Sequence, residues 1–414
     1  MYDFINKNRW TTLVAGSLAT FVSMFPAVWS IFQRAASEAY GITLTQSANV
    51  FSFTIAFYGL FCLIGGKLQE MFPPRLVFMV GAVIMSLSFL SLYLIRGTVS
   101  PVVIYALHSF LFGFGCGINN PAFTTPMLRW YADKNGFAIG VTYAVSRAML
   151  VGETYIGNWL LSSFGIHRAM LIIGIVTMAV MVLCAPTVIN PSDEYIRRMV
   201  AKANAQSSGS SAARGTVDFS TGEMLRTVQY YLMLFCGIFA TPAYLLMASS
   251  IVTFGQTRGL SENAAVTAVA IATAGSAFAK FFVPSVSDKV GRKKSALVIL
   301  TIMLVSAVLL WKSRGLAVVI TYAFLYSAYD GFYSLVPPIT NDMFGFRYSG
   351  SNVAFVSLFN TIASFATPFR FTVLHSRFGD DTVHYLGIVT CALALVCMAL
   401  LKTDTSHLKS SDDI

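Results

Sequence analysis

Four ionisable side chains interrupt long apolar stretches of this sequence. They are Arg147, Glu153, Lys280 and Asp330, and each lies among mostly apolar neighbours. A charge at the centre of a membrane-spanning helix costs about 2.5 to 3.5 kcal/mol on insertion scales, so a charge that is kept there is a functional candidate. Cations and acids of this kind could bind an anion, carry a proton or pair with each other.

Three of these charges are expected at a similar depth. Counted at about 1.5 Å per residue from the polar loop at the near end of each helix, Lys280 lies roughly 12 Å in, Arg147 roughly 16 Å and Asp330 roughly 18 Å. With Glu153 further along the helix of Arg147, they leave a partly compensated positive centre that an organic carboxylate could complete. The alternative is that Lys280, Arg147 and Asp330 pair with one another and only hold helices together.

Uncharged polar side chains fall in the same layer. Asn120 lies mid-way along the fourth apolar segment, and Tyr329 and Tyr333 flank Asp330 on one helix face at positions i and i+4. We expect these three side chains, together with Asn360, to contact a substrate. The alternative is structural, with the amide bonded to a neighbouring helix and the tyrosines facing lipid.

The elements that carry these residues must be membrane helices. Of 414 residues, 56% are hydrophobic and 11% are charged, and the mean hydropathy is +0.68, which excludes a soluble fold. One bilayer span takes roughly 20 apolar residues. The sequence predicts an all-α membrane protein with twelve transmembrane helices, near residues 10–32, 47–66, 76–95, 101–128, 137–161, 167–189, 229–254, 262–284, 295–311, 315–337, 351–373 and 383–401.

A long polar stretch divides the predicted spans into two sets of six. It contains the run AKANAQSSGSSAARG, which is typical of a flexible linker. Glu70 and Asp288 follow the second span of each set in similar sequence contexts, which indicates two pseudo-symmetric copies. The expected domains are a six-helix lobe at 1–189, a cytoplasmic linker at 190–228, a second six-helix lobe at 229–402 and a cytoplasmic tail at 403–414.

Basic residues orient the predicted helices. Eighteen Lys and Arg residues fall on the linker side of the predicted spans and seven on the other side, so both termini are expected in the cytoplasm. This topology explains the formal charge of +10 without a nucleic-acid partner. The six cysteines all lie in apolar segments, which argues against disulfides and metal ligands. We expect a multi-pass protein of a bacterial inner or plasma membrane.

The loop after the eighth predicted span matches the pattern GxxxD(K/R)xGR(K/R) from its acid onwards, with Pro284 at the position of the first glycine. The matching residues are Asp288, Lys289, Gly291, Arg292 and Lys293. With this loop the sequence resembles the major facilitator superfamily. The first copy of the pattern is degraded, with Glu70 in place of Asp. The resemblance implies a cytoplasmic gate formed by Glu70, Asp288 and Arg292, in which the acid caps helix ends and pairs with cations.

A narrower resemblance covers nearly the whole chain. The sequence is similar to the oxalate/formate antiporter family and to the related monocarboxylate transporters. The run before the seventh span is the most specific match. The matching stretches are Asn8-Arg9-Trp10, Gly65-Gly66-Lys67-Leu68-Gln69-Glu70, Arg129-Trp130, Asp133-Lys134, Gly222-Glu223-Met224-Leu225-Arg226-Thr227, Gln229-Tyr230, Ser287-Asp288-Lys289 and Asn341-Asp342-Met343-Phe344-Gly345.

The resemblance also bears on the charges. Oxalate/formate antiporters carry an arginine at the position of Lys280, where it resembles a carboxylate clamp, and a second cation at the position of Asn360. A lysine is a point charge without the fork of arginine, so the changes favour a monocarboxylate over oxalate. Monocarboxylate transporters have an aspartate at the position of Ser276, so here Asp330 or Glu153 would have to carry a coupled proton.

The sequence therefore predicts a secondary transporter that moves a small organic anion by alternating access, as a proton symporter or an anion exchanger. Formate, lactate or pyruvate fits better than oxalate. The alternative is a transporter of a neutral or zwitterionic solute such as an amino acid, in which Asp330 binds an amine. No enzyme activity, cofactor or metal site is expected, because no phosphate loop, catalytic triad or metal cluster is present in the sequence. The expected partners are the substrate, protons and the lipid bilayer, and the chain is expected to be a monomer.

Overall fold

The computed structural model describes residues 9–206, 217–378 and 381–405. The described residues are predominantly helical and contain no strand, which confirms the predicted all-α class. Residues 1–8, 207–216 and 406–414 lie outside this description, and they include the centre of the predicted linker and most of the predicted tail.

Each predicted apolar segment falls on a helix. In the first half these are α2 (Trp10–Ser23), η1 (Phe25–Val28), α3 (Trp29–Tyr40), α4 (Leu44–Met71), α5 (Pro74–Leu94), α6 (Pro101–Ile104), η2 (Tyr105–Phe110), α7 (Leu111–Trp130) and α8 (Asn135–Cys184), followed by the turn η3 (Ala185–Thr187). In the second half they are α11 (Val228–Thr257), α12 (Glu262–Val290), α13 (Arg292–Lys312), α14 (Leu316–Phe344), α15 (Ser349–Phe378) and α16 (Asp381–Leu400).

Seven helical stretches within the described residues are long and apolar enough to cross a membrane. One of them, Asn135–Thr187, covers two predicted spans because α8 is interrupted only at Gly165. Gly165 has φ 70°, a left-handed value that favours glycine, and it breaks the helix between the two spans.

The chain forms two compact units. The N-terminal unit comprises residues 1–131 and 145–196, and the C-terminal unit comprises residues 132–144 and 197–414. The first residues of α8, up to Ala144, therefore pack with the C-terminal unit. The boundaries differ there from the lobes expected at 1–189 and 229–402.

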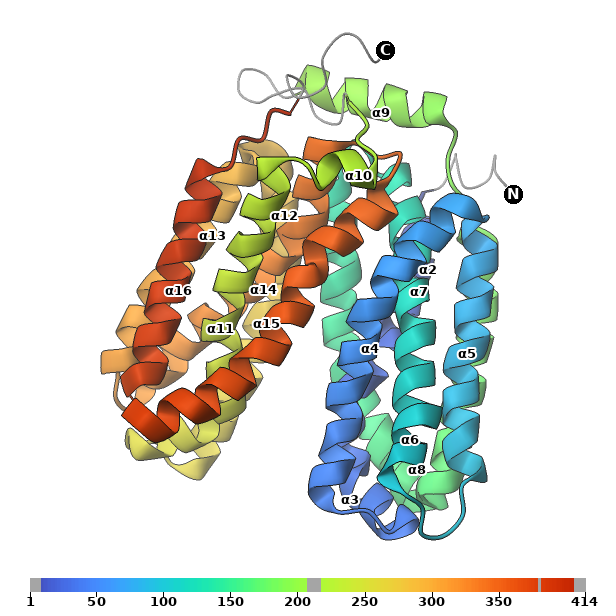
Figure 1. Ribbon diagram of the computed structural model, residues 1–414, viewed down its shortest axis with the longest axis vertical. Helices are drawn as coiled ribbons and strands as arrows, with labels where there is room; N and C mark the ends of the chain where they lie inside the picture. Colours follow the sequence, from blue (N-terminus) through green and yellow to red (C-terminus); the bar gives the residue numbers. More distant parts are fainter. Residues whose placement is uncertain (1–8, 207–216, 379–380, 406–414) are drawn as a thin grey trace. The chain divides into compact units, whose positions relative to one another are not determined.

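In the N-terminal unit, α7 lies between α4 and α5 (Figure 1). Small residues make this packing close. A Cβ atom at Gly115 of α7 would lie 2.6 Å from the carbonyl oxygen of Gly81 on α5, and one at Gly117 would lie 2.6 Å from the Phe61 Cβ on α4. The core also contains large side chains that are almost fully buried, including Trp29, Phe32, Phe78, Phe89 and Phe112.

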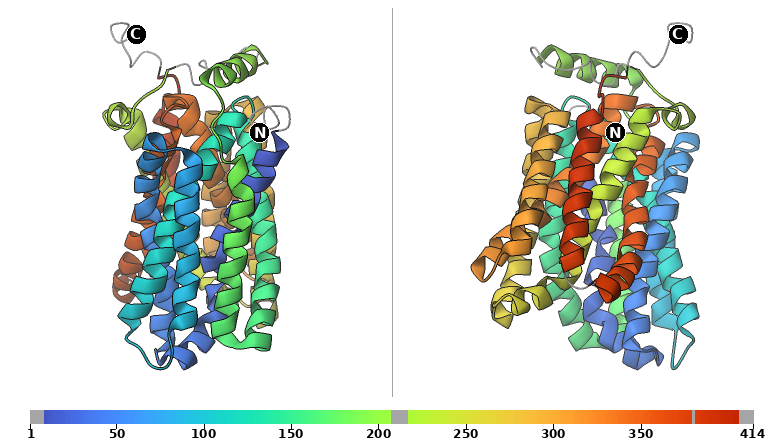
Figure 2. Two further views of the ribbon diagram at one scale, coloured as in Figure 1. Left: turned by 90° about the vertical axis from the view of Figure 1, so that its right-hand side faces the viewer. Right: turned by 60° about the vertical axis from the view of Figure 1, so that its left-hand side comes forward.

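In the C-terminal unit, α14 packs against α12 and α13, and α11 packs against α15 and α16. The right-hand view of Figure 2 shows α16 (red) beside α11 (yellow-green). Tyr322, Phe332, Phe344 and Phe359 are buried between these helices. The contact between α12 and α14 positions the charged residues described next.

Two short helices lie in the predicted linker at 190–228. They are α9 (Asp193–Gln206) and α10 (Thr221–Met224). Two acids in the first turn of α9 favour its N-terminus. Ile196 and Val200 are one turn apart on a less exposed face, whereas Arg197 is exposed. The described part of the linker is thus structured as well as polar.

Candidate functional site

An ion pair joins α12 to α14 in the C-terminal unit. The Lys280 Nζ lies 3.1 Å from the Asp330 Oδ1, and the two side chains are 12% and 4% exposed. Ser276, one turn before Lys280, donates a hydrogen bond to the Asp330 Oδ2. Both carboxylate oxygens of Asp330 are therefore bound from α12. For Lys280 and Asp330, the structure shows the pairing that the sequence left as one alternative.

Two tyrosine rings flank the lysine ammonium. The Lys280 Nζ lies 5.7 Å from the ring centre of Tyr143 and 5.6 Å from that of Tyr333, and the two ring centres are 6.3 Å apart. Contacts of this kind contribute about 0.5 to 2 kcal/mol each. Tyr143 belongs to the segment of α8 that packs in the C-terminal unit. The ammonium group is thus bordered by one carboxylate and two aromatic faces.

Tyr329 and Asn360 form a second polar group. The Tyr329 hydroxyl donates to the Asn360 Oδ1 at 3.1 Å and lies 3.2 Å from the Thr241 Oγ1. Its ring stacks on Tyr244, with ring centres 4.1 Å apart. Tyr329 is only 3% exposed, so this group ties together α11, α14 and α15. Tyr333, one turn later, is less buried and faces Lys280.

The remaining predicted site residues belong to the N-terminal unit. Asn120 lies on α7, and Arg147 and Glu153 lie on α8; all three are partly buried. The neighbouring Asn119 is fully buried; its side-chain amide donates to the Phe78 carbonyl at 2.7 Å and accepts the Ala82 amide at 3.2 Å, so it is a packing residue that binds α5. The relation of Asn120, Arg147 and Glu153 to Lys280 stays a prediction.

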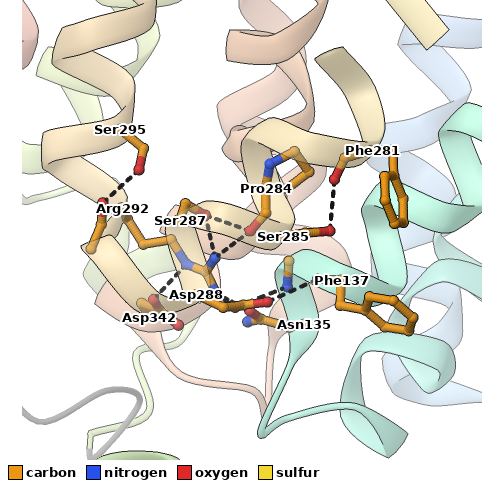
Figure 3. Close-up of polar contacts among 12 residues, drawn as sticks. Asn135, Phe137, Phe281, Pro284, Ser285, Ser287, Asp288, Arg292, Ser295 and Asp342 are labelled. Carbon is orange, nitrogen blue, oxygen red and sulfur yellow. Dashed lines mark hydrogen bonds and ion pairs between the residues drawn. The ribbon is translucent and has the colours of Figure 1, made fainter. Parts of the chain in front are cut away.

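A polar cluster forms around Arg292 in the C-terminal unit, and Figure 3 shows it. The Arg292 Nε donates to the Asp342 Oδ2 at 3.0 Å, and its Nη2 donates to the Asp288 Oδ1 at 2.5 Å and to the Asn135 side chain. Its Nη1 donates to the Ser287 Oγ at 2.5 Å. Burial leaves Arg292 only 6% exposed, so two carboxylates compensate one nearly buried cation.

Asp288 also caps the start of α8. Its Oδ2 accepts the Phe137 amide at 2.9 Å and its Oδ1 accepts the Gly136 amide at 3.4 Å. The first amides of a helix have no partner within the helix, so a carboxylate there is favourable. Close approach requires glycine, because a Cβ at Gly136 would overlap the carbonyl oxygen of Pro284.

Glu70, from the degraded copy of the loop pattern, is bound differently. Its Oε2 lies 3.2 Å from the Lys67 Nζ within α4, and the Lys67 side chain is 65% exposed. A local pair with an exposed lysine is worth little. Where the first copy departs from the pattern, its acid thus forms a local ion pair within α4, whereas Asp288 belongs to a cluster that links several helices.

Several members of these groups were not predicted from the sequence. Tyr143 lies one turn before Arg147, and that spacing could have placed it beside the predicted charged layer. Asn135 follows the matching stretch Asp133-Lys134, and Asp342 lies inside another matching stretch. Thr241 and Tyr244 have no such signal. Within the described residues, no group of three or more His, Cys, Asp or Glu side chains could hold a metal ion.

Curated relatives are transporters. The chain is 25% identical over 392 residues to the oxalate:formate antiporter of Oxalobacter formigenes, covering 94% of this chain and 90% of that protein. It is 21% identical over 363 residues to the uncharacterized MFS-type transporter YhjX of Escherichia coli (strain K12), covering 85% of each.

Solved structures share the fold. A bacterial homologue of the iron transporter ferroportin, in its outward-facing state with soaked iron, gives a TM-score of 0.72 at 13% identity and covers 94% of this chain and 98% of that chain. The transporter FucP in its outward conformation gives 0.70 at 12% identity, with the same coverage. At these identities the likeness concerns the fold alone.

The family model of the Major Facilitator Superfamily matches residues 11–368 and 233–412. Together with the apolar helices, this match makes the chain an integral, multi-pass membrane transporter. The chain belongs to the Major Facilitator Superfamily.

Proposed function

We propose that this transporter moves a small organic monocarboxylate by alternating access, and that Lys280 supplies the charge that binds the carboxylate. The observation that carries the proposal is the pair of Lys280 with Asp330, 3.1 Å apart and nearly buried. A cation retained at such a position is costly, and this one is paired with a carboxylate that a substrate carboxylate can replace.

Replacement of Asp330 by a substrate has a consequence for charge. One ammonium balances one negative charge, so Asp330 is left uncompensated unless it takes up a proton when the substrate binds. Ser276 can remain its hydrogen-bond partner in either state, because a hydroxyl donates and accepts. Proton symport follows from this exchange of partners. If Asp330 stays ionised, the same site works as an anion exchanger.

The charge proposed for the substrate follows from the side chains around Lys280. The relative that is an oxalate:formate antiporter supports an anionic substrate. Here Asn360 supplies an amide that is bonded to Tyr329, so the described C-terminal group offers one cation, with Tyr143 and Tyr333 beside it. One point charge suits formate, lactate or pyruvate better than oxalate. Arg147 and Asn120 are proposed to complete the site.

The cluster of Asp288 and Arg292 is proposed as the cytoplasmic gate, with Glu70 as its weaker counterpart. Its support is the direct link from Asp288 to the first amides of α8. Opening would break these bonds and closing would remake them. We also propose a monomer in a bacterial inner membrane, with both termini in the cytoplasm, on the distribution of basic residues.

Uptake into proteoliposomes tests the proposal. Labelled formate, lactate, pyruvate and oxalate are offered to the wild type, to Lys280→Ala and to the control Lys294→Ala, which removes an exposed lysine on α13. We expect monocarboxylate uptake in the wild type and the control, and its loss in Lys280→Ala. Normal uptake by Lys280→Ala would refute the role of Lys280. Competition by amino acids instead of monocarboxylates would favour a zwitterionic substrate.

A further inference from the structure

Residues Asp218–Met224, which we call the clasp, pack on the turn between α14 and α15. The Phe219 amide donates to the Phe344 carbonyl at 3.0 Å, and the two rings meet edge to face with centres 5.7 Å apart. Met224 is fully buried. Ser220 and Glu223 form a reciprocal capping box that fixes the clasp's own turn. The clasp thus has a defined structure and a defined packing site on the turn between α14 and α15.

Asp218 binds the backbone of the turn. Its Oδ1 accepts the amides of Phe346 and Arg347, each at 3.0 Å. The turn is shaped for this contact, because Gly345 has φ 80° and a Cβ atom there would overlap the Asp218 carboxylate. Hydrogen bonds from amides to a carboxylate are stronger than those between neutral groups.

Asn352, which is fully buried on α15, binds the clasp with both ends of its amide. Its Nδ2 donates to the Phe219 carbonyl at 3.0 Å, and its Oδ1 accepts the Thr221 hydroxyl at 3.0 Å. An unpaired buried amide costs free energy. The Asn352 amide is paired with the docked clasp and would lose both of these bonds if the clasp moved away, so it stabilises the docked state.

The clasped turn continues directly into the gate cluster. Asp342, which accepts the Arg292 Nε at 3.0 Å, lies in the last turn of α14, two residues before Phe344. Ser349 at the start of α15 donates to the Asn341 Oδ1 at 2.6 Å and holds the two helix ends together. A shift of this turn would therefore move Asp342 relative to Arg292.

We propose that the clasp is a positioning element of the cytoplasmic gate, and that Asp218 and Asn352 are its positioning residues. By fixing the end of α14, they keep Asp342 against Arg292, and Arg292 in turn keeps Asp288 against the first amides of α8. This gives a role to the run Gly222–Thr227, which the transport site does not use. The proposal rests on the gate described above under the proposed function.

Hydrogen exchange of the purified transporter tests this without a substrate. The readout is the exchange rate of the amides of Gly136 and Phe137, which are remote from the clasp. Asp218→Ala is expected to speed their exchange about tenfold, as for loss of one strong hydrogen bond. Asp218→Asn keeps one acceptor oxygen but loses the charge, so its exchange should be slower than in Asp218→Ala and faster than in the wild type. Asp193→Ala, which removes an exposed acid on α9, is the matched control and should change nothing.

Two further variants separate the outcomes. Asp288→Ala removes the cap itself, so unchanged exchange of Gly136 and Phe137 in this variant would overturn the gate. Fast exchange in Asp288→Ala, with unchanged exchange in Asp218→Ala, would overturn the clasp alone. Where Asp218→Ala does not fold, Thr221→Val removes a single side-chain bond and should speed exchange about two- to threefold. No change in Thr221→Val would then overturn the proposal.

Discussion

Lys280 on α12 and Asp330 on α14 form an ion pair of 3.1 Å whose two side chains are no more than 12% exposed. Removal of one half of such a pair leaves the other as an uncompensated buried charge. The pair affects stability because its two charges compensate each other, and it affects transport because Lys280 is proposed to bind the substrate. Mutations can therefore change one property without the other.

Lys280→Ala is expected to lower the free energy of unfolding by about 3 to 5 kcal/mol, because Asp330 loses its counter-ion. The double variant Lys280→Ala/Asp330→Asn removes both charges and should recover most of that stability, yet remain inactive in uptake. Thermal denaturation and uptake assays measure the two effects. Activity in the stable double variant would show that neither charge binds the substrate.

Asp330→Asn is expected to bind the anion and to lose the dependence of uptake on a proton gradient. Asparagine cannot take up a proton, so an acidic exterior no longer drives transport, and each anion that enters carries net charge. Uptake with and without an imposed pH gradient measures this. A gradient response equal to that of the wild type would exclude Asp330 as the proton carrier.

Much of the helical architecture follows from hydropathy, and the limits of prediction have physical causes. Apolar length alone predicts the helices, because the bilayer demands internal backbone bonding. Counting the rise per residue placed Lys280 and Asp330 at similar depths, but rise alone cannot tell which faces meet. The pairing of Tyr329 with Asn360 and Thr241 depends on the rotation of α11, α14 and α15, which an apolar pattern on all sides leaves open.

The linker shows a different limit. The Ser, Ala and Gly composition predicted a flexible segment. The short amphipathic pattern that forms α9 was therefore not interpreted as a helix. The docking of Asp218 was also beyond a single sequence, since its partners are main-chain amides of Phe346 and Arg347, which have no sequence signature.

Asp288→Ala is expected to lower the free energy of unfolding by about 1 to 3 kcal/mol, because the first amides of α8 lose their cap and Arg292 loses a partner. Transport should fall with it if the cluster is the gate. Asp193→Ala, an exposed acid with the same charge, is the control for thermal denaturation and uptake. Equal stability and equal uptake in both variants would show that Asp288 neither stabilises the fold nor acts as part of the gate.

Gly115→Ala is expected to destabilise the N-terminal unit by about 1 to 3 kcal/mol, since the added methyl would meet the backbone of α5. Gly152→Ala on α8 is the contrast, because its Cβ would have no neighbour within 4 Å. This second variant should be neutral or gain up to about 1 kcal/mol from helix propensity. Melting temperatures measure both, and the same loss in both variants would contradict the close packing of α7 on α5.

Ligand binding to two purified variants tests the role of Lys280 most directly. Purified Asp330→Asn and Lys280→Ala/Asp330→Asn, which differ only at Lys280, are heated with formate, lactate or pyruvate. Saturation at about one hundred times Kd stabilises a protein by about 2.7 kcal/mol. The account predicts that a monocarboxylate raises the Tm of Asp330→Asn and leaves that of the double variant unchanged. An equal rise in both would contradict it.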